Sequence, residues 1–336
     1  MGSGSGSGCR GEHYGAAMDA HLDDEQIDRS AGLPESAKSA IRLENQIAGQ
    51  YWGGVEWRIV ATFVVTLALW IAVIVAAHRG SIPLWLGFVL NTALATTFYM
   101  PMHESVHGNI SGKVTSMRWL NELVGKLSQV PLLMAHSAHR TSHMKHHAFT
   151  NEPGRDPDHF THGTLSQIPK KWFAVAMVNT FLPLLALIPA LRRLLPKGMA
   201  ESASSDPGAQ RSMFRMWLLS TIALVVCAVL GVGVEALVLW YVPARLTMFW
   251  LMVVFAWYPH HPADTPGRYL DTRVAVFPGS GLLIRGHDHH ALHHLYPRVA
   301  HYRLRGLWQE MSADLVAKGV RAEGRATNAT RPVVWS

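Results

Sequence analysis

Long apolar runs alternate with short polar segments along most of the chain. Residues 59–77 are nineteen uncharged, mainly apolar positions, and a helix of that length is about 28 Å long, enough to cross the hydrocarbon core of a bilayer. A second run, 82–102, follows a tight turn, and two further runs, 214–233 and 236–257, are separated by a very short one. We therefore predict an all-α integral membrane protein with four transmembrane helices in two hairpins.

The composition agrees with a membrane protein. Of 336 residues 49% are hydrophobic, the formal net charge is +7 and the mean hydropathy is +0.11. Lysines and arginines cluster beside the apolar runs, which fits the positive-inside rule and anionic lipid better than nucleic acid, so we predict no nucleic-acid partner. Only two cysteines occur, Cys9 and Cys227. The chain therefore has neither a disulfide framework nor a cysteine-based metal site.

The polarity pattern divides the chain into three segments. Residues 1–50 are expected to be a flexible leader and cytoplasmic tail, with a short interfacial helix at about 37–47, and residues 2–8 look like an engineered Gly-Ser linker. Residues 51–310 form the predicted membrane domain, and residues 311–336 a polar C-terminal tail.

Eight histidines in three short boxes carry the candidate chemistry. The boxes read His-Glu-Ser-Val-His at 103–107, His-Met-Lys-His-His at 143–147 and His-Ala-Leu-His-His at 290–294. Each has histidines at i and i+4, and the last two add one at i+3, so on a helix each box forms one face. Neutral imidazole is a common ligand of iron, zinc and copper. Three such boxes are hard to explain as core packing, and they predict a site for a pair of metal ions.

An apolar run at 172–195 raises a question of topology. If it crossed the membrane, the third box would lie on the opposite side from the other two and could not share their metals. Lys170 and Lys171 precede this run, and Arg192, Arg193 and Lys197 lie at its end. Positive charge at both ends predicts that both ends face the cytoplasm, so we expect an in-plane or re-entrant segment. All boxes and both termini are then cytoplasmic.

In box type, order and placement after apolar runs, the chain resembles the membrane fatty acid desaturase superfamily from about Tyr51 to Arg305. That superfamily also contains carotenoid hydroxylases, ketolases and alkane hydroxylases. The local contexts Asp-Pro-Asp-His at 156–159, Tyr-Pro-His at 258–260 and His-His-Leu-Tyr-Pro at 293–297 most resemble the β-carotene hydroxylase branch and bacterial desaturase-like relatives.

The resemblance implies two iron ions, bound by the box histidines and one further histidine. His260 occupies the matching position, with His261 as the alternative. The implied ligands are His103, His107, His143, His146, His147, His260, His290, His293 and His294. Asp156 and Asp158 are candidates for orienting the ligands, although ordinary loop aspartates beside Pro157 are an equal alternative, and His139 and His287 are expected to support the site. We expect no catalytic residue outside the metal centre.

The implied activity is an O₂-dependent oxidation of unactivated C–H bonds in a long-chain lipid, by fatty acyl desaturation or hydroxylation. No segment resembles an electron-carrier domain or a dinucleotide fingerprint. Electrons are therefore expected from an external ferredoxin, rubredoxin or cytochrome b5 type donor with its reductase. A carotenoid β-ring hydroxylase is the alternative within the class. A divalent metal transporter is the alternative from another class, although transporter ligands usually lie near the bilayer midplane.

Overall fold

The computed structural model describes residues 34–181, 188, 190, 193 and 206–329. The chain divides into two units, 1–47 and 48–336. The described part of the first unit lies in helix α2 (Glu35–Tyr51), at the position predicted for the interfacial helix. The predicted linker and most of the leader are outside the described residues.

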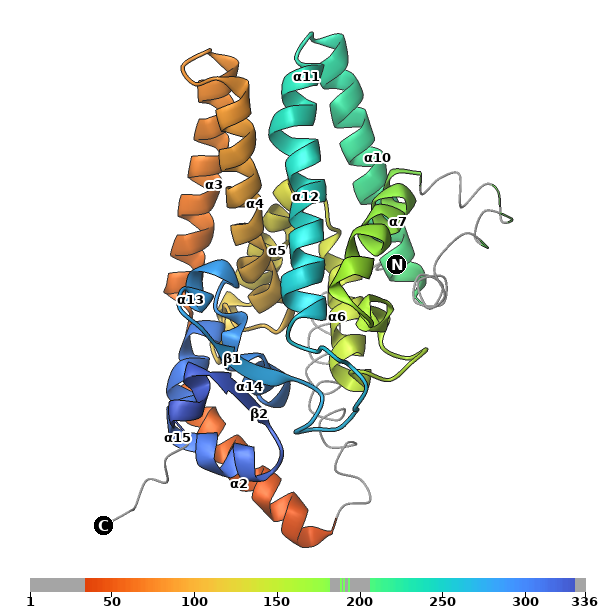
Figure 1. Ribbon diagram of the computed structural model, residues 1–336. Helices are drawn as coiled ribbons and strands as arrows, with labels where there is room; N and C mark the ends of the chain where they lie inside the picture. The colour runs from red at the N-terminus through yellow and green to blue at the C-terminus, as the bar shows by residue number, and fades with distance from the viewer. Residues whose placement is uncertain (1–33, 182–187, 189, 191–192, 194–205, 330–336) are drawn as a thin grey trace, which may run out of the picture. The chain divides into compact units, whose positions relative to one another are not determined.

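Two long helices form the first predicted hairpin. They are α3 (Trp57–His78) and α4 (Leu84–Val106), which pack along each other (Figure 1). Gly80 lies in the connecting turn with φ +70°, a conformation that costs glycine little. Phe63 of α3 meets Phe98 of α4 edge to face, with ring centroids 6.1 Å apart.

The second hairpin consists of α10 and a long helix with two π-helical segments. In chain order its parts are α10 (Pro207–Val229), α11 (Gly233–Ala236), η5 (Leu237–Tyr241), α12 (Val242–Leu251) and η6 (Met252–Trp257). Pro243 follows the first π-helical segment. Because proline has no amide proton and its ring crowds the preceding turn, it is compatible with the wider π turn.

Three of these helices are long and apolar enough to cross a bilayer: Trp57–His78, Pro207–Val229 and Gly233–Trp257. They correspond to the first, third and fourth predicted spans. The second predicted span coincides with α4, which is 23 residues long and carries the polar Asn91 inside its apolar run. The side-chain amide of Asn91 donates to the carbonyl of Leu239 at 2.9 Å, so this buried polar group joins the two hairpins.

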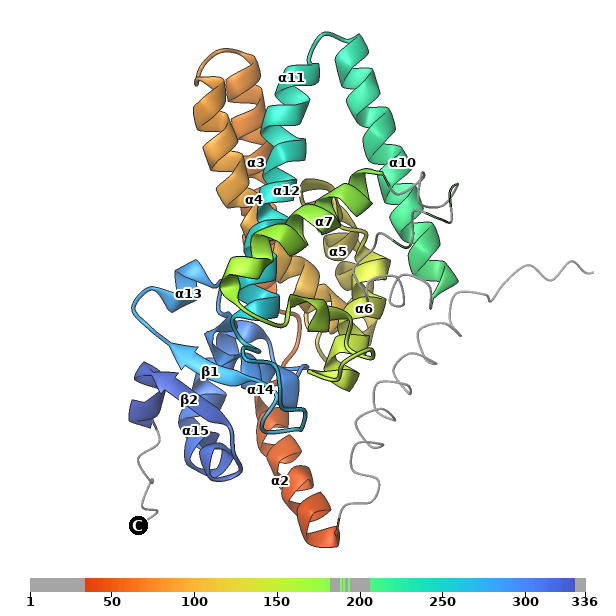
Figure 2. The same ribbon diagram turned by 45° about the vertical axis from the view of Figure 1, so that its right-hand side comes forward.

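The turns of both hairpins lie at the same end of this unit, and the histidine boxes lie toward the other (Figure 1). Three shorter helices follow α4 near the box end: α5 (Trp119–Leu132), α6 (His136–Phe149) and α7 (Ile168–Thr180). Helix α7 packs obliquely against α12 and η6 (Figure 2). It covers the first part of the run at 172–195; most of that run after Phe181 is outside the described residues.

The C-terminal part contains a small sheet, which corrects the all-α prediction. Strands β1 (Arg273–Val276) and β2 (Arg321–Gly324) pair in parallel, with Arg273 opposite Arg321 and Val276 opposite Gly324. Each strand has only four residues, too few for a periodicity of two to stand out in the sequence. Strand β2 falls within the segment that the sequence assigns to a polar tail.

Short helical elements connect and follow these strands. Helix α15 (Leu304–Ala317) packs the buried Trp308 and Leu315 into this part of the protein. The remaining elements are η1 (Thr115–Met117), η2 (Pro157–Thr161), η3 (Leu165–Gln167), α13 (Ser280–Leu283), η7 (His287–His289), α14 (His290–Leu295), η8 (His301–Arg303), α15 (Leu304–Ala317) and η9 (Arg325–Ala329).

Candidate metal centre

Eight histidines from distant parts of the sequence come together near the box end of α4 and η6. They form two groups, and within each group the candidate ligand atoms all lie within 4.8 Å of one another. The first group is His103, His107, His143 and His293, and the second group is His146, His260, His290 and His294. All three boxes therefore meet at one place, as the topological argument required.

Helix geometry explains how the second and third boxes are shared between the groups. Residues at i and i+4 of a helix are about 40° apart, whereas the residue at i+3 is offset by about 60° to the other side. In α6, His143 and His147 face the first group and His146 faces the second. In α14 the pattern is reversed: His290 and His294 face the second group and His293 the first.

The first group has closely spaced ring nitrogens. His103 Nε2 lies 3.1 Å from His293 Nε2, and His107 Nε2 lies 2.9 Å from His143 Nε2. His147 joins them, because its Nε2 is 3.1 Å from that of His143 and 3.0 Å from that of His293. Five of the nine predicted ligands thus point their Nε2 atoms into the first group.

The second group contains the other four predicted ligands. His260 Nε2 lies 2.9 Å from His290 Nε2, which lies 3.0 Å from His294 Nε2. The ring of His146 is 4.7 Å from that of His260 and 5.0 Å from that of His294, measured between centroids. The two groups are adjacent, since the rings of His147 and His294 stack at 4.2 Å.

Hydrogen bonding alone cannot satisfy these nitrogens. A neutral Nε2 carries either one proton or one lone pair and makes one hydrogen bond at a time, yet the Nε2 atoms of His143, His290 and His293 each have two imidazole nitrogens within 3.1 Å. For a metal–nitrogen distance of about 2.1 Å, ligands at right angles are about 3.0 Å apart. The residues therefore fit two metal ions, and an all-nitrogen donor set suits iron, zinc or copper better than magnesium or calcium.

Burial keeps most of these imidazoles in the form that binds metal. It lowers the pKa of His143, His260 and His290 well below the usual value, and neighbouring histidines lower it further. The same holds for His293 and His294. Neutral imidazole has a free lone pair, so little energy is spent on removing a proton when a metal binds.

His146 is the exception, because it has a buried carboxylate partner. Its Nδ1–H donates to Asp156 Oδ1 at 2.8 Å. Burial lowers the pKa of His146, but the charge and hydrogen bond of Asp156 outweigh burial and raise the pKa to about 9. The bond leaves Nε2 to face the second group, as in the carboxylate–histidine–metal arrangement.

The other three supporting residues predicted from the sequence also lie at the centre. Asp158 Oδ2 is 3.9 Å from His146 Nδ1, which is too long for a hydrogen bond. His139 stacks on His143 with centroids 5.3 Å apart. His287 lies between the groups, 4.8 Å from His103 and 4.7 Å from His290 by ring centroids.

Glu104 was missed by the sequence analysis. Its carboxylate is fully buried and accepts hydrogen bonds from Asn109 Nδ2 at 2.7 Å and from His301 Nδ1 at 3.1 Å. Its Oε1 also lies 3.7 Å from His103 Nδ1. The sequence did contain a signal for this residue, because Glu104 is a charged residue inside the first box, at the end of a predicted apolar helix.

Asn151 was missed as well, although it fixes the loop that follows α6. Its backbone N–H donates to Asp156 Oδ2 at 2.8 Å, and its side-chain amide donates to the carbonyl of Asp271 at 2.8 Å. Asn151 has φ +64°, a conformation that asparagine tolerates better than most residues. It thereby connects the carboxylate that orients His146 to the segment between His260 and β1.

A cavity of about 180 Å³ opens onto both histidine groups. His143, His146, His287 and His290 line its metal side. The remaining wall is mainly apolar and consists of Tyr99, Met134, Phe160, Val175, Met248, Leu251, Met252, Phe255 and Ala256, with His139 and Asp158. An apolar group entering this cavity would therefore meet the two groups of ligands directly.

The model of the fatty acid desaturase family matches residues 79–323, a range that includes every predicted ligand. The chain belongs to this family. The resemblance inferred from the histidine boxes is thereby confirmed, and the three helices long and apolar enough to cross a bilayer agree with a membrane protein. The two histidine groups are accordingly the candidate metal centre of a fatty acid desaturase family member.

A curated relative extends this comparison. The chain is 25% identical over 229 residues to a protein named omega-3 fatty acid desaturase fat-1 from Caenorhabditis elegans. The aligned part is 60% of this chain and 54% of the relative. The chain therefore matches about half the length of that relative.

Proposed function

We propose that this protein is an O₂-dependent di-iron membrane oxidoreductase that desaturates the acyl chain of a long-chain lipid. The observation that carries the proposal is the pair of adjacent all-histidine groups facing an apolar cavity. Family membership and the name of the relative support desaturation over other oxidations.

Two iron ions would occupy the two groups. The first would be held by His103, His107, His143, His147 and His293, and the second by His146, His260, His290 and His294. When bound, the iron pair supplies an oxidant made from O₂ that can remove hydrogen from an unactivated C–H bond.

The residues around the metal sites would position the substrate and exclude water. Leu251, Met252 and Phe255 present apolar side chains from α12 and η6, so a hydrocarbon segment can replace water next to the histidines. Asp156 holds the proton of His146 Nδ1 and fixes that ring. His287 faces the cavity from between the groups and would restrict where the acyl chain lies.

The proposed arrangement in the membrane has four spans, with α4 as the span that accompanies α3. The cost of the polar Asn91 in lipid would be reduced because its side-chain amide donates to the carbonyl of Leu239 in the neighbouring hairpin. The histidine groups and both termini would then face the cytoplasm, where an external ferredoxin, rubredoxin or cytochrome b5 type donor can deliver electrons. Residues 172–195 would lie in plane or re-enter.

The two alternatives give different results in one experiment. Hydroxylation of a fatty acyl chain or a carotenoid ring begins with the same hydrogen removal, so only the product distinguishes these reactions. Lipid and pigment profiling of a host with and without the gene should show a new double bond in an acyl chain. A hydroxylated carotenoid or fatty acid without a new double bond would show that the reaction is hydroxylation and not desaturation.

Metal analysis tests the remaining alternative. We expect about two iron ions per chain after anaerobic purification, because nine imidazoles can give each ion four or five ligands. A single exchangeable zinc ion would favour divalent metal transport instead. The ligands lie near the ends of α4 and η6 rather than at mid-helix, which weighs against a transporter.

A further inference from the structure

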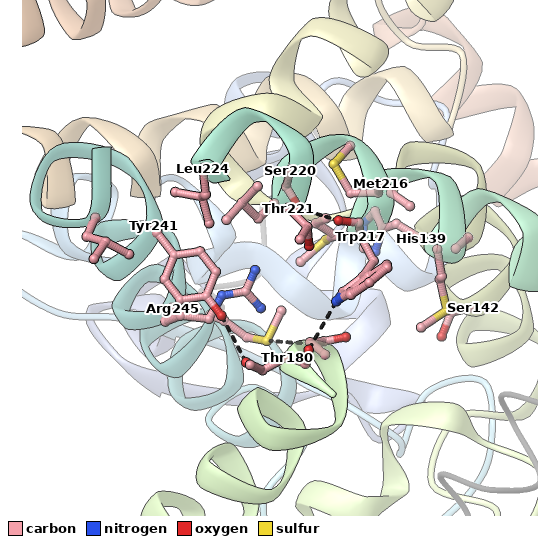
Figure 3. Close-up of a pocket in the computed structure, with 18 residues that line it drawn as sticks. His139, Ser142, Thr180, Met216, Trp217, Ser220, Thr221, Leu224, Tyr241 and Arg245 are labelled. Carbon is pink, nitrogen blue, oxygen red and sulfur yellow. Dashed lines mark hydrogen bonds between the residues drawn. The ribbon is translucent and has the colours of Figure 1, made fainter. Parts of the chain in front are cut away.

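A second and larger cavity lies between α6, α7, α10 and the long helix of the second hairpin (Figure 3). Its volume is about 460 Å³, within the usual range for sites that hold small ligands. Most of its wall is apolar or weakly polar, and includes Met213, Met216, Trp217, Leu224 and Leu237.

Among the described residues that line this larger cavity, Arg245 is the one with a formal charge. Its guanidinium lies beside the ring of Tyr241, 5.1 Å from the centroid (Figure 3). The Nε and Nη1 atoms are buried and have no hydrogen-bond partner among the described residues. In the described part of the chain no carboxylate forms an ion pair with Arg245. Its guanidinium instead makes a cation–π interaction with Tyr241.

The position of Arg245 makes this charge costly. It lies in the candidate span Gly233–Trp257, twelve residues from each end (245 − 233 and 257 − 245). An arginine at the centre of a membrane-spanning helix is unfavourable by several kcal/mol unless it meets a partner or water. Intramembrane charges that persist therefore usually have a function, and a buried donor aimed into a cavity indicates the kind of ligand that the cavity takes.

The larger cavity adjoins the smaller cavity beside the metal centre. Met134, His139 and Met248 line both it and the smaller cavity beside the histidine groups. Arg245 and Phe255 are ten residues apart on one continuous helix, which corresponds to about 15 Å along its axis. Phe255 contacts His287 with ring centroids 4.2 Å apart, so the helix that carries Arg245 also reaches the candidate reaction site.

We propose that Arg245 binds the carboxylate of a long-chain free acid and thereby sets which carbon of the chain reaches the metal centre. A carboxylate offers two oxygens to the guanidinium and cancels its charge inside the apolar site. The hydroxyls of Thr180 and Tyr241, which bond to each other at 2.9 Å, line the same cavity. The assignment of the reacting carbon rests on the proposed desaturase function, whereas the binding of the acid does not.

A single-chain acid fits this cavity better than a lipid with a large headgroup. A phosphodiester or a nucleotide-bearing thioester would need many more polar partners at this depth. Besides Arg245, His139, Asn179 and Trp217, the described lining offers only five hydroxyls, those of Ser142, Thr180, Ser220, Thr221 and Tyr241. A methyl ester has the same chain and no charge. The contrast between acid and ester therefore isolates the role of the guanidinium.

The test uses the full-length protein in phosphatidylcholine nanodiscs. We would measure binding of radiolabelled octadecanoic acid and its methyl ester to wild type, Arg245→Met, Arg245→Lys and the control Arg215→Met, whose arginine is exposed on α10. Arg245→Met should weaken acid binding roughly tenfold or more, because hydrogen bonds to charged groups are lost, and leave ester binding unchanged. Arg245→Lys should keep a preference for the acid, and Arg215→Met should match wild type.

The outcomes separate the two proposals. Equal affinity of wild type for acid and ester, or equal acid affinity of wild type and Arg245→Met, would overturn the role of Arg245 even if the enzyme desaturates lipids. Arginine-dependent acid binding without any new double bond would instead leave the acid site standing and refute the desaturase assignment. Iron content of each variant, compared with wild type, shows whether the metal centre has folded.

Discussion

His146 Nδ1 and Asp156 Oδ1 lie 2.8 Å apart, and both side chains are almost completely buried. Two backbone N–H groups, of Asn151 and Asp158, also donate to this carboxylate at 2.8 Å. These two backbone groups therefore hold the Asp156 carboxylate in place, and the carboxylate in turn orients the ring of His146. The sequence left two roles for Asp156 equally open: an ordinary turn aspartate or a residue that orients a candidate ligand. In the structure this one side chain does both.

We expect Asp156→Asn to weaken metal binding in the second group. The amide can no longer stabilise the Nδ1–H of His146 as a carboxylate does, and loss of such partners typically reduces metal affinity or activity about 10–100-fold. Iron content after chelator competition measures the effect. Asp158→Asn is the matched control, because its carboxylate is 3.9 Å from the same nitrogen; an equal or larger loss in that variant would contradict the assignment.

The same pair predicts a pH dependence for the metal-free protein. The pKa of His146 is raised from 6.5 to about 9 in the folded state. A group whose pKa is higher in the folded state stabilises the fold. This contribution is fully present at pH values below the unfolded-state pKa, and it is lost as the pH rises through the folded-state pKa. The midpoint of thermal unfolding of chelator-treated protein should therefore fall between pH 6.5 and about 9. Asp156→Asn should flatten this change, and an identical slope in both proteins would rule out the pair as its source.

The sequence predicted the site better than it predicted the fold around it. Histidines at i and i+4 on a helix must share a face, so the boxes could be identified as candidate ligand sets without a structure. The assignment of His146 to the second group and His293 to the first depends on how α6 and α14 face each other, which no local pattern encodes. The pairing of β1 with β2 is also a contact between distant segments, and each strand is too short to have a pattern of its own.

Glu104 shows a different limit of sequence analysis. The residue lies within the first box, but its importance comes from His301 and Asn109, which reach it only in the folded protein. A buried carboxylate without such partners would be very unfavourable, so its burial is meaningful only together with them. Sequence spacing identifies residues that act together on one helix and misses partners from elsewhere.

Glu104→Gln should lower stability and disturb the first group. The amide keeps the size of the side chain but loses the charge that favours the hydrogen bonds from His301, each worth about 1.5–3 kcal/mol when a charged group takes part. We expect a lower thermal midpoint and reduced iron content. Glu310→Gln is the control, since Glu310 bonds to Tyr51 at an exposed position. If Glu104→Gln behaves like that control, the buried carboxylate has no supporting role.

Cysteine labelling can test the four-span arrangement. In a background without native cysteines, exposed positions Ser81 and Val234 mark the turns of the two hairpins, and exposed Ser166 lies near the box end, just before α7. Impermeant reagents should label Ser81→Cys and Val234→Cys from the outer side and Ser166→Cys from the cytoplasmic side. Labelling of Ser81→Cys and Val234→Cys from opposite sides would mean that one of the two hairpins is not inserted as proposed. Ser204 follows the run at 172–195 and would mark its far end, but it is outside the described residues.

His260 provides the most decisive test of the ligand set, because it lies outside every box. Its Nε2 is 2.9 Å from that of His290, and its ring packs 5.0 Å from that of His294. The neighbouring His261 instead packs against Trp257, with ring centroids 4.5 Å apart. As a ligand, His260 should be needed for metal binding, whereas His261 should affect it little.

His260→Ala should lose iron and turnover together, as His143→Ala should, while the protein still inserts into the membrane. The second group would retain three imidazoles, too few to hold its metal against competing chelators as firmly as four. His261→Ala should keep most of both properties. Iron content and product yield measured on the same preparations distinguish these outcomes. A His260→Ala protein with full iron and normal product would place the ninth ligand elsewhere, with His287, which lies between the two groups, as the next residue to replace.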